Sequence, residues 1–221
     1  MEIPSGVIRG RNLLAALLVL SLSTLSGCAS QLNMPNMPNR PSFAVIGAAG
    51  HGNPIAEYQV GRFAFDCGRS AHQRANGLAW IQLAADQNLA MAQYYMGTIY
   101  MKGQGVPQNT SLALKWIHKA AEYGAPAAQL ELGDLYEAGN VIPVDDASAY
   151  FWFSVLARSV HSNITIYNIG RLQAIAKSHL ANVSAALTLA QRATVDRRVA
   201  AWKPKPGAPY NGIVPLGNRR D

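Results

Sequence analysis

Residues 88–124 read NLAMAQYYMGTIYMKGQGVPQNTSLALKWIHKAAEYG, and this stretch decides the fold. Its first half places apolar side chains at helical spacing, namely Ala92, Met96, Ile99 and Tyr100. Gly103 and Pro107 then interrupt that helix. A new apolar stripe predicts a second helix, with Asn109 as its N-cap and Gly124 just past its end. The stretch is therefore predicted to form two helices joined by a turn.

The same pattern recurs at a spacing of 36 residues in both directions. Three units share one register, residues 53–88, 89–124 and 125–160. Each unit has a glycine and a tryptophan at equivalent positions: Gly61, Gly97 and Gly133, and Trp80, Trp116 and Trp152. We expect the glycines to allow close helix–helix approach and the tryptophans to fill the core. A fixed period of this length is typical of a solenoid.

The repeated pattern also carries a family resemblance. It reads A-Q-Y-x-x-G-x-x-Y-x-x-G-x-G-V-P and then A-L-x-W-x-x-K-A-A-E-x-G, which resembles the Sel1-like repeat, a relative of the tetratricopeptide repeat. The resemblance implies an all-α fold: a right-handed α-solenoid of about three helix–turn–helix repeats with C-terminal capping helices. It also implies an adaptor or scaffold role in protein complexes, without catalytic residues common to the family.

The N-terminal segment, residues 1–27, has the features of a lipoprotein signal peptide. Two arginines, Arg9 and Arg11, precede an apolar run that is too short for a stable membrane span. Leu-Ser-Gly-Cys follows at residues 25–28 and resembles a bacterial lipobox, which implies lipidation of Cys28. The alternative is an ordinary signal peptide followed by a chance cysteine.

The residues after Cys28 predict where the chain is anchored. Ala29 stands where an aspartate would imply inner-membrane retention, so the resemblance implies an outer-membrane lipoprotein on the periplasmic face. Several acyl chains anchor a protein stably without a transmembrane helix. Residues 28–52 are rich in Asn, Pro, Gly and Ser, and we interpret them as a flexible tether that includes a loop at residues 47–52. Asn53-Pro54 suits the start of the first repeat helix.

The repeat register is lost after the third unit. Residues 161–202 are predicted to form capping helices at 162–180 and 184–202, with Ser162 and Ser184 as N-caps, because a solenoid needs a terminal element with a polar outer face. Residues 203–221 are predicted to be a disordered basic tail.

Charge is unevenly distributed along the chain, whose formal net charge is +7. Residues 53–160 hold seven Lys or Arg and nine Asp or Glu, whereas residues 161–221 hold nine basic and two acidic residues. The basic C-terminal end could contact an anionic polymer or lipid, or it could be a solvated cap. Nucleic acid is not expected as the partner of an exported lipoprotein.

Residue patterns for catalysis or cofactor binding are absent from the sequence. The five histidines, His51, His72, His118, His161 and His179, show no metal-ligand spacing, so no metal is predicted. No nucleophile elbow, phosphate-binding loop or paired-carboxylate motif is present. Cys67 aligns with Gly103 at the turn between two helices, where we expect it to be partly exposed. The chain is therefore predicted to be neither an enzyme nor a cofactor-binding protein.

These observations predict an outer-membrane-anchored periplasmic adaptor or scaffold that binds an unknown envelope protein. One alternative is a cell-wall-associated protein whose basic end contacts peptidoglycan or lipopolysaccharide. A remote alternative, reported for a few relatives, is a β-lactamase-like enzyme, which the missing nucleophile motif opposes.

A partner-binding strip is predicted on the first helices of the repeats, because in tetratricopeptide relatives these helices line the concave surface. The side chains opposite the packing positions are Tyr95, Thr98, Glu131, Asp134 and Glu137. Tyr95 could anchor a partner, and the three carboxylates could attract a basic segment. The alternative is that the acidic residues form a solvated helix face.

Overall fold

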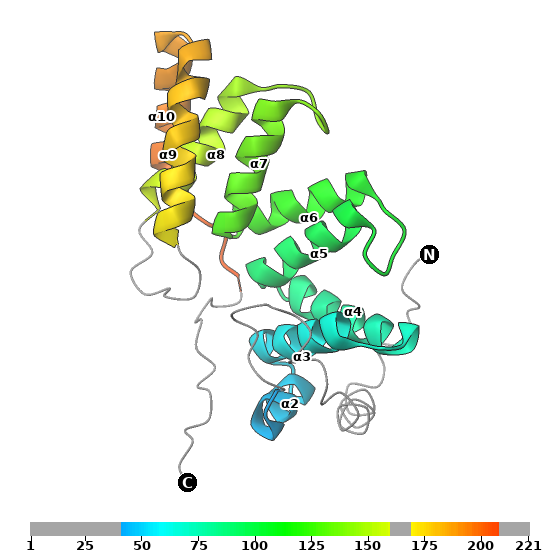
Figure 1. Ribbon diagram of the computed structural model, residues 1–221. Helices are drawn as coiled ribbons and strands as arrows, with labels where there is room; N and C mark the ends of the chain where they lie inside the picture. Colours follow the sequence, from blue (N-terminus) through cyan, green and yellow to red (C-terminus); the bar gives the residue numbers. More distant parts are fainter. Residues whose placement is uncertain (1–40, 160–168, 208–221) are drawn as a thin grey trace.

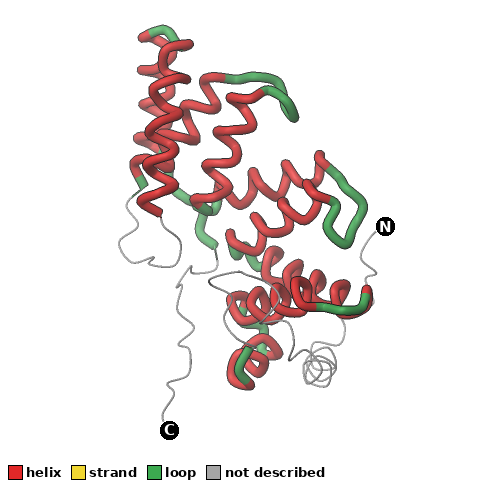
Figure 2. Tube along the Cα trace, viewed as in Figure 1, coloured by secondary structure: helices red, strands yellow, loops and turns green. Residues whose placement is uncertain are grey.

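The computed structural model describes residues 41–159 and 169–207, and in these two ranges all the regular secondary structure is helical (Figure 2). The helices are α2 Phe43–Gly50, α3 Pro54–Cys67, α4 Ala71–Asp86, α5 Ala90–Lys102, α6 Thr110–Glu122, α7 Pro126–Ala138, α8 Asp146–Arg158, α9 Ile169–Ala186 and α10 Leu189–Ala201. The predicted signal peptide, the predicted lipidation site Cys28 and the predicted N-cap Ser162 lie outside the described residues. No helix in the described ranges is long and apolar enough to cross a membrane.

Six of these helices form three antiparallel pairs that stack one after another (Figure 1). Helix α3 packs against α4, α5 against α6, and α7 against α8. Contacts of α4 with α5 and of α6 with α7 join successive pairs, and α9 and α10 pack against α8 at the end of the stack. The fold is therefore the all-α solenoid with terminal capping helices that the repeat pattern predicts.

Local capping chemistry sets the start of the repeat helices. The side chain of Asn53 accepts hydrogen bonds from the backbone N–H groups of residues 55 and 56, at 3.0 Å each. Asn109 caps α6 in the same way by accepting from Leu112 N at 2.9 Å, and Asp145 caps α8. Gly103 ends α5 in the left-handed region at φ 66°, which a residue with a Cβ rarely adopts. The predicted caps at Asn53 and Asn109 are confirmed.

The repeated glycines lie where two helices of a pair approach closely, as predicted. A Cβ on Gly97 would lie 2.6 Å from Ile117 Cγ1, and one on Gly61 would lie 2.8 Å from Trp80 Cβ. A Cβ on Gly133 would overlap the ring of Phe153. These contacts are shorter than normal van der Waals separations. Replacing any of these glycines with alanine would therefore force the paired helices or the contacting side chain to move.

The three equivalent tryptophans are not equally buried. Trp80 is 1% exposed and Trp152 is 8% exposed, so both are core residues as predicted. Trp116 is only half-buried, with the ammonium group of Lys119 lying 5.3 Å from its ring centroid. The prediction that Trp116 fills the core in the same way is therefore wrong. Trp116 packs at the edge of the cluster formed by the first two units.

The predicted flexible tether contains a helix. Helix α2 begins after Ser42, whose hydroxyl accepts a hydrogen bond from Val45 N at 3.4 Å. Ile46 and Ala49 are buried in a cluster with residues of α3 and with Trp80. The interpretation of residues 43–50 as tether and loop is wrong, because packing against α3 stabilises a segment whose glycines disfavour a helix in isolation. Residues 28–40 of the predicted tether lie outside the described residues.

The C-terminal elements also differ from the prediction. Helix α9 continues through Ser184, so Ser184 is not an N-cap; its hydroxyl donates to Ala181 O at 3.1 Å. Thr188 caps α10 instead, in a capping box with Gln191. Residues 203–207, predicted to be disordered, pack against the repeats: Lys205 N donates to Glu122 O at 2.9 Å.

Cys67 also differs from its prediction. It is the last residue of α3 rather than part of the turn, and it is 8% exposed, so its side chain lies in the core. The turn begins one residue later, at Gly68.

Candidate partner-binding surface

The first helix of each repeat lies in the inner layer of the stack. Helix α3 has no exposed residue, and in α5 and α7 only the last residue, Lys102 or Ala138, is exposed. Exposed side chains instead occur along the second helices α4 and α6, for example His72 and Lys115. The predicted strip therefore lies on helices that are shielded from several sides, and its side chains are half-buried.

Tyr95 of α5 is held by residues of α3. Its ring packs edge-on against Tyr58 and Phe65, with centroid distances of 6.0 and 6.3 Å. Its hydroxyl donates to Asp66, and the guanidinium group of Arg62 lies 5.4 Å from its ring centroid. Burial, followed by the hydrogen bond to Asp66, raises the pKa of Tyr95 well above its usual value. Tyr95 is therefore part of the α3–α5 interface, and sequence reasoning missed its partners Arg62 and Asp66.

Thr98 and Glu131 continue the strip toward the third repeat. Thr98 lies one turn after Tyr95 and donates its hydroxyl hydrogen to Tyr95 O at 2.8 Å. Glu131 of α7 lies beside Tyr94 of α5 and links the second and third units. Burial, followed by the negative charge and hydrogen bonding of Glu131, raises the pKa of Tyr94 well above its usual value.

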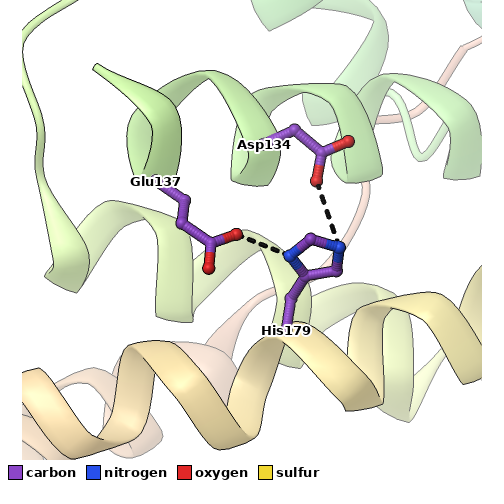
Figure 3. A group of neighbouring side chains, drawn as sticks. All are labelled: Asp134, Glu137 and His179. Carbon is purple, nitrogen blue, oxygen red and sulfur yellow. Dashed lines mark hydrogen bonds and ion pairs between the residues drawn. The ribbon is translucent and has the colours of Figure 1, made fainter.

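The last two residues of the strip contact the capping helix α9. Figure 3 shows the imidazole of His179 on α9 between Asp134 and Glu137 of α7. Nδ1 of His179 lies 2.5 Å from Glu137 Oε2, and Nε2 lies 3.9 Å from Asp134 Oδ1. The ring of His179 stacks on Phe153 of α8, with a centroid distance of 5.0 Å. Helix α9 therefore covers part of the acidic end of the strip.

The pKa of the Asp134 carboxyl group is raised from its usual value. Burial is the main cause, the charges of Glu137 and Glu131 act in the same direction, and His179 opposes them. Sequence reasoning found Asp134 and Glu137 because they share one face of α7. It missed His179, which is 42 residues from Glu137 in the chain.

The basic C-terminal end is exposed as expected from its composition. The exposed cationic side chains of this end include Arg171 and Lys177 of α9, Arg197 and Arg198 of α10, and Lys203 and Lys205. Arg198 lies over the ring of Phe151 at 4.8 Å from the centroid, and Lys205 Nζ pairs with Glu122 at 2.6 Å. Arg171 and Lys177 of α9, and Lys203 after α10, are exposed to solvent.

Comparison with known families explains the periodicity of this surface. The model for the Sel1 repeat matches residues 54–89, 90–124 and 126–159. The chain carries three Sel1 repeats. These matches begin within a residue or two of the unit boundaries predicted from the period. Sel1 repeats mediate protein–protein interactions, and solenoids built from them generally act as non-catalytic scaffolds.

Solved structures with Sel1-like repeats share this fold. The protective antigen c5321 of uropathogenic Escherichia coli, which displays an SLR fold, has a TM-score of 0.57 and 22% identity, over 72% of this chain. A Sel1 repeat protein from Oxalobacter formigenes has a TM-score of 0.51 and 26% identity, over 63% of this chain and 96% of its own. The match spans 32% of c5321, about a third of its length. No protein with a curated description matches the chain.

Proposed function

We propose that this protein is a periplasmic adaptor, anchored to the outer membrane through lipid on Cys28, that binds another envelope protein with its Sel1 repeats. The supporting observation is that the three repeats stack into one solenoid whose first helices present half-buried polar side chains side by side. A continuous, rigid face of this kind is suited to binding an extended segment of a partner.

The acidic end of the strip is the part that we assign to the partner. Asp134 keeps 48% of its side-chain surface exposed, whereas Glu137 keeps 27% because α9 lies over it. Glu131 lies on the same helix, beside Tyr94 of α5. Together with Thr98, these carboxylates form a surface suited to a basic segment of the partner. Tyr95 supports this surface from below through its contacts with α3.

Reversing the charge of Glu131 is expected to weaken partner binding about tenfold, as for a moderately important interface residue. Glu131→Lys removes an attractive charge and places a repulsive one before a basic segment. The measurement is the recovery of the crosslinked partner from intact cells by quantitative mass spectrometry, beside a thermal unfolding curve of the purified variant.

Asp86→Lys is the matched control for this experiment, because it reverses an exposed acidic residue on the outer helix α4. It should leave recovery unchanged. Equal recovery for Glu131→Lys and wild type, with both proteins folded, would exclude the acidic strip as the binding surface. Crosslinks to peptidoglycan or lipopolysaccharide in place of a protein would favour the alternative, in which the exposed cations of α9 and α10 bind cell-wall polymer.

Replacing Cys28 is expected to abolish the lipid anchor. Cys28→Ser removes the thiol that would receive diacylglycerol, so the variant should incorporate no labelled palmitate and should leave the membrane fraction. The measurement is metabolic labelling followed by membrane fractionation. Cys67→Ser is the control and should retain the label, because it leaves the Leu-Ser-Gly-Cys motif at residues 25–28 intact. Palmitate incorporation that persists in Cys28→Ser would contradict the lipoprotein assignment.

A further inference from the structure

The group formed by Asp134, Glu137 and His179 has the chemistry of a metal site as well as that of an ion pair. Each residue offers one ligand atom, and these atoms all lie within 4.8 Å of one another. Asp134 and Glu137 are three residues apart and share one face of α7, and His179 faces them from α9 (Figure 3). Imidazole nitrogen together with carboxylate oxygen is a donor set that Zn²⁺ and similar divalent transition metals accept.

The cluster has more negative charge than its one imidazole can neutralise. Among the described residues, Oδ1 of Asp134 has no hydrogen-bond partner although it is shielded from solvent, and His179 Nε2 lies 3.9 Å from it. Glu131 and Glu137 lie within one turn of Asp134 on α7 and add negative charge beside it. A divalent cation at this point would supply the positive charge that the ionised carboxylates lack.

The orientation of the His179 ring fits metal binding through Nε2. Because an ionised Glu137 carboxylate can only accept a hydrogen bond, its 2.5 Å contact places a proton on Nδ1, so in the neutral imidazole the lone pair is on Nε2. Stacking on Phe153 of α8 fixes the plane of the ring. A carboxylate that accepts the second N–H of a ligating histidine is the usual outer-shell partner in zinc sites.

The distance between the two remaining ligand atoms is close to that of a bound ion. A tetrahedral zinc ion with bonds of about 2.0–2.1 Å holds two ligand atoms about 3.4 Å apart. Nε2 of His179 and Oδ1 of Asp134 are 3.9 Å apart. Small side-chain rotations that bring these two atoms about half an ångström closer would give the separation found around a bound zinc ion.

We propose that these residues form a divalent transition-metal site that joins the third repeat to the capping helix. His179 Nε2 and Asp134 Oδ1 bind the ion, Glu137 orients the imidazole, and water completes the coordination because the side chains remain partly exposed. The ion bridges α7 and α9, so it stabilises the folded chain at this end of the solenoid. This site depends neither on the lipid anchor nor on the identity of a partner.

The test is a titration of the untagged full chain, solubilised in detergent and freed of metal with a chelator, with ZnCl2 at pH 7.5. Isothermal titration calorimetry should give one saturable site per chain, and thermal unfolding followed by circular dichroism should shift to higher temperature. His179→Gln and Asp134→Asn should abolish both effects. Glu137→Gln should weaken binding by about 10–100-fold, the usual effect of losing an outer-shell carboxylate.

His72→Gln is the control, since His72 is an exposed histidine on α4. It should bind zinc as the wild type does. Absence of saturable binding by the wild type would overturn the proposal, and so would unchanged binding by folded His179→Gln or Asp134→Asn. If His179→Gln does not fold, Asp134→Asn decides the question, because it is nearly isosteric and lies on the more exposed side of the cluster.

Discussion

Replacing Trp80 with alanine is expected to lower the free energy of unfolding by about 3–5 kcal/mol, the range for emptying a large buried aromatic site. The same substitution one repeat later, Trp116→Ala, is expected to cost only about 1–2 kcal/mol. The reason is burial: Trp80 is 1% exposed and belongs to a core cluster with residues of α2 and α3, whereas Trp116 is half-buried at the edge of its cluster. Trp80 and Trp116 occupy equivalent positions in the repeat, but the losses of unfolding free energy on their replacement by alanine are therefore expected to differ severalfold.

The measurement is urea unfolding followed by circular dichroism, combined with hydrogen exchange read out by region. Hydrogen exchange is needed because a solenoid is stabilised by neighbour contacts and can lose one end before the other. Trp80→Ala should reduce protection in α2 to α4 and leave α7 and α8 largely protected. Trp80→Phe is the conservative control, and it also removes a buried indole N–H that has no hydrogen-bond partner within residues 41–159 and 169–207. Equal losses of unfolding free energy for Trp80→Ala and Trp116→Ala would contradict the expectation that burial determines the cost.

Features that depend on local chemistry were predictable from the sequence. Asn53 and Asn109 cap helices because their side chains satisfy backbone N–H groups within three residues. The repeat period likewise predicts the paired helices, and the recurring glycines mark close approach between them. In each case the residues that interact are close in sequence or occupy the same position in every unit.

Helix α2 could not be predicted in the same way. Its sequence, FAVIGAAG, is short and contains two glycines, so its intrinsic helix propensity is weak. It is helical because Ile46 and Ala49 pack against α3, and that contact is not part of the repeat pattern. The contact between residues 203–207 and Glu122 is also outside the repeat pattern. It joins Lys205 to a residue 83 positions earlier in the chain.

The candidate site was predictable only in part. Sequence spacing places Asp134 and Glu137 on one face of α7, which the structure confirms. Their contact with His179 depends on how α9 packs against the last repeat, after the repeat register has ended. Tyr95 similarly lies on the predicted strip, but its hydroxyl is used by Asp66 of the preceding unit. Contacts between side chains across interfaces that do not repeat can be identified only from the structure.

Replacing Gly77 with alanine is expected to lower the free energy of unfolding by about 3 kcal/mol or more, as much as Trp80→Ala does. A Cβ on Gly77 would lie 2.7 Å from Gly61 O and 2.8 Å from Phe65 Cα, and it would also overlap Phe65 N. These obstructing atoms belong to the backbone of α3. A change of rotamer therefore cannot relieve the contact, and α3 and α4 would have to move apart.

The repeat register sharpens this expectation, because Gly77 is equivalent to Ala113 and Ala149 in the next two units. Alanine is fully buried at both of those positions, so the cost at Gly77 would show that the first pair of helices packs more closely than the others. Gly47→Ala in α2 is the control. A Cβ there meets no atom within 4 Å, so alanine should raise stability by up to about 1 kcal/mol through helix propensity. The measurement is urea unfolding of both variants. A Gly77→Ala protein as stable as Gly47→Ala would mean that α3 and α4 do not cross at this distance.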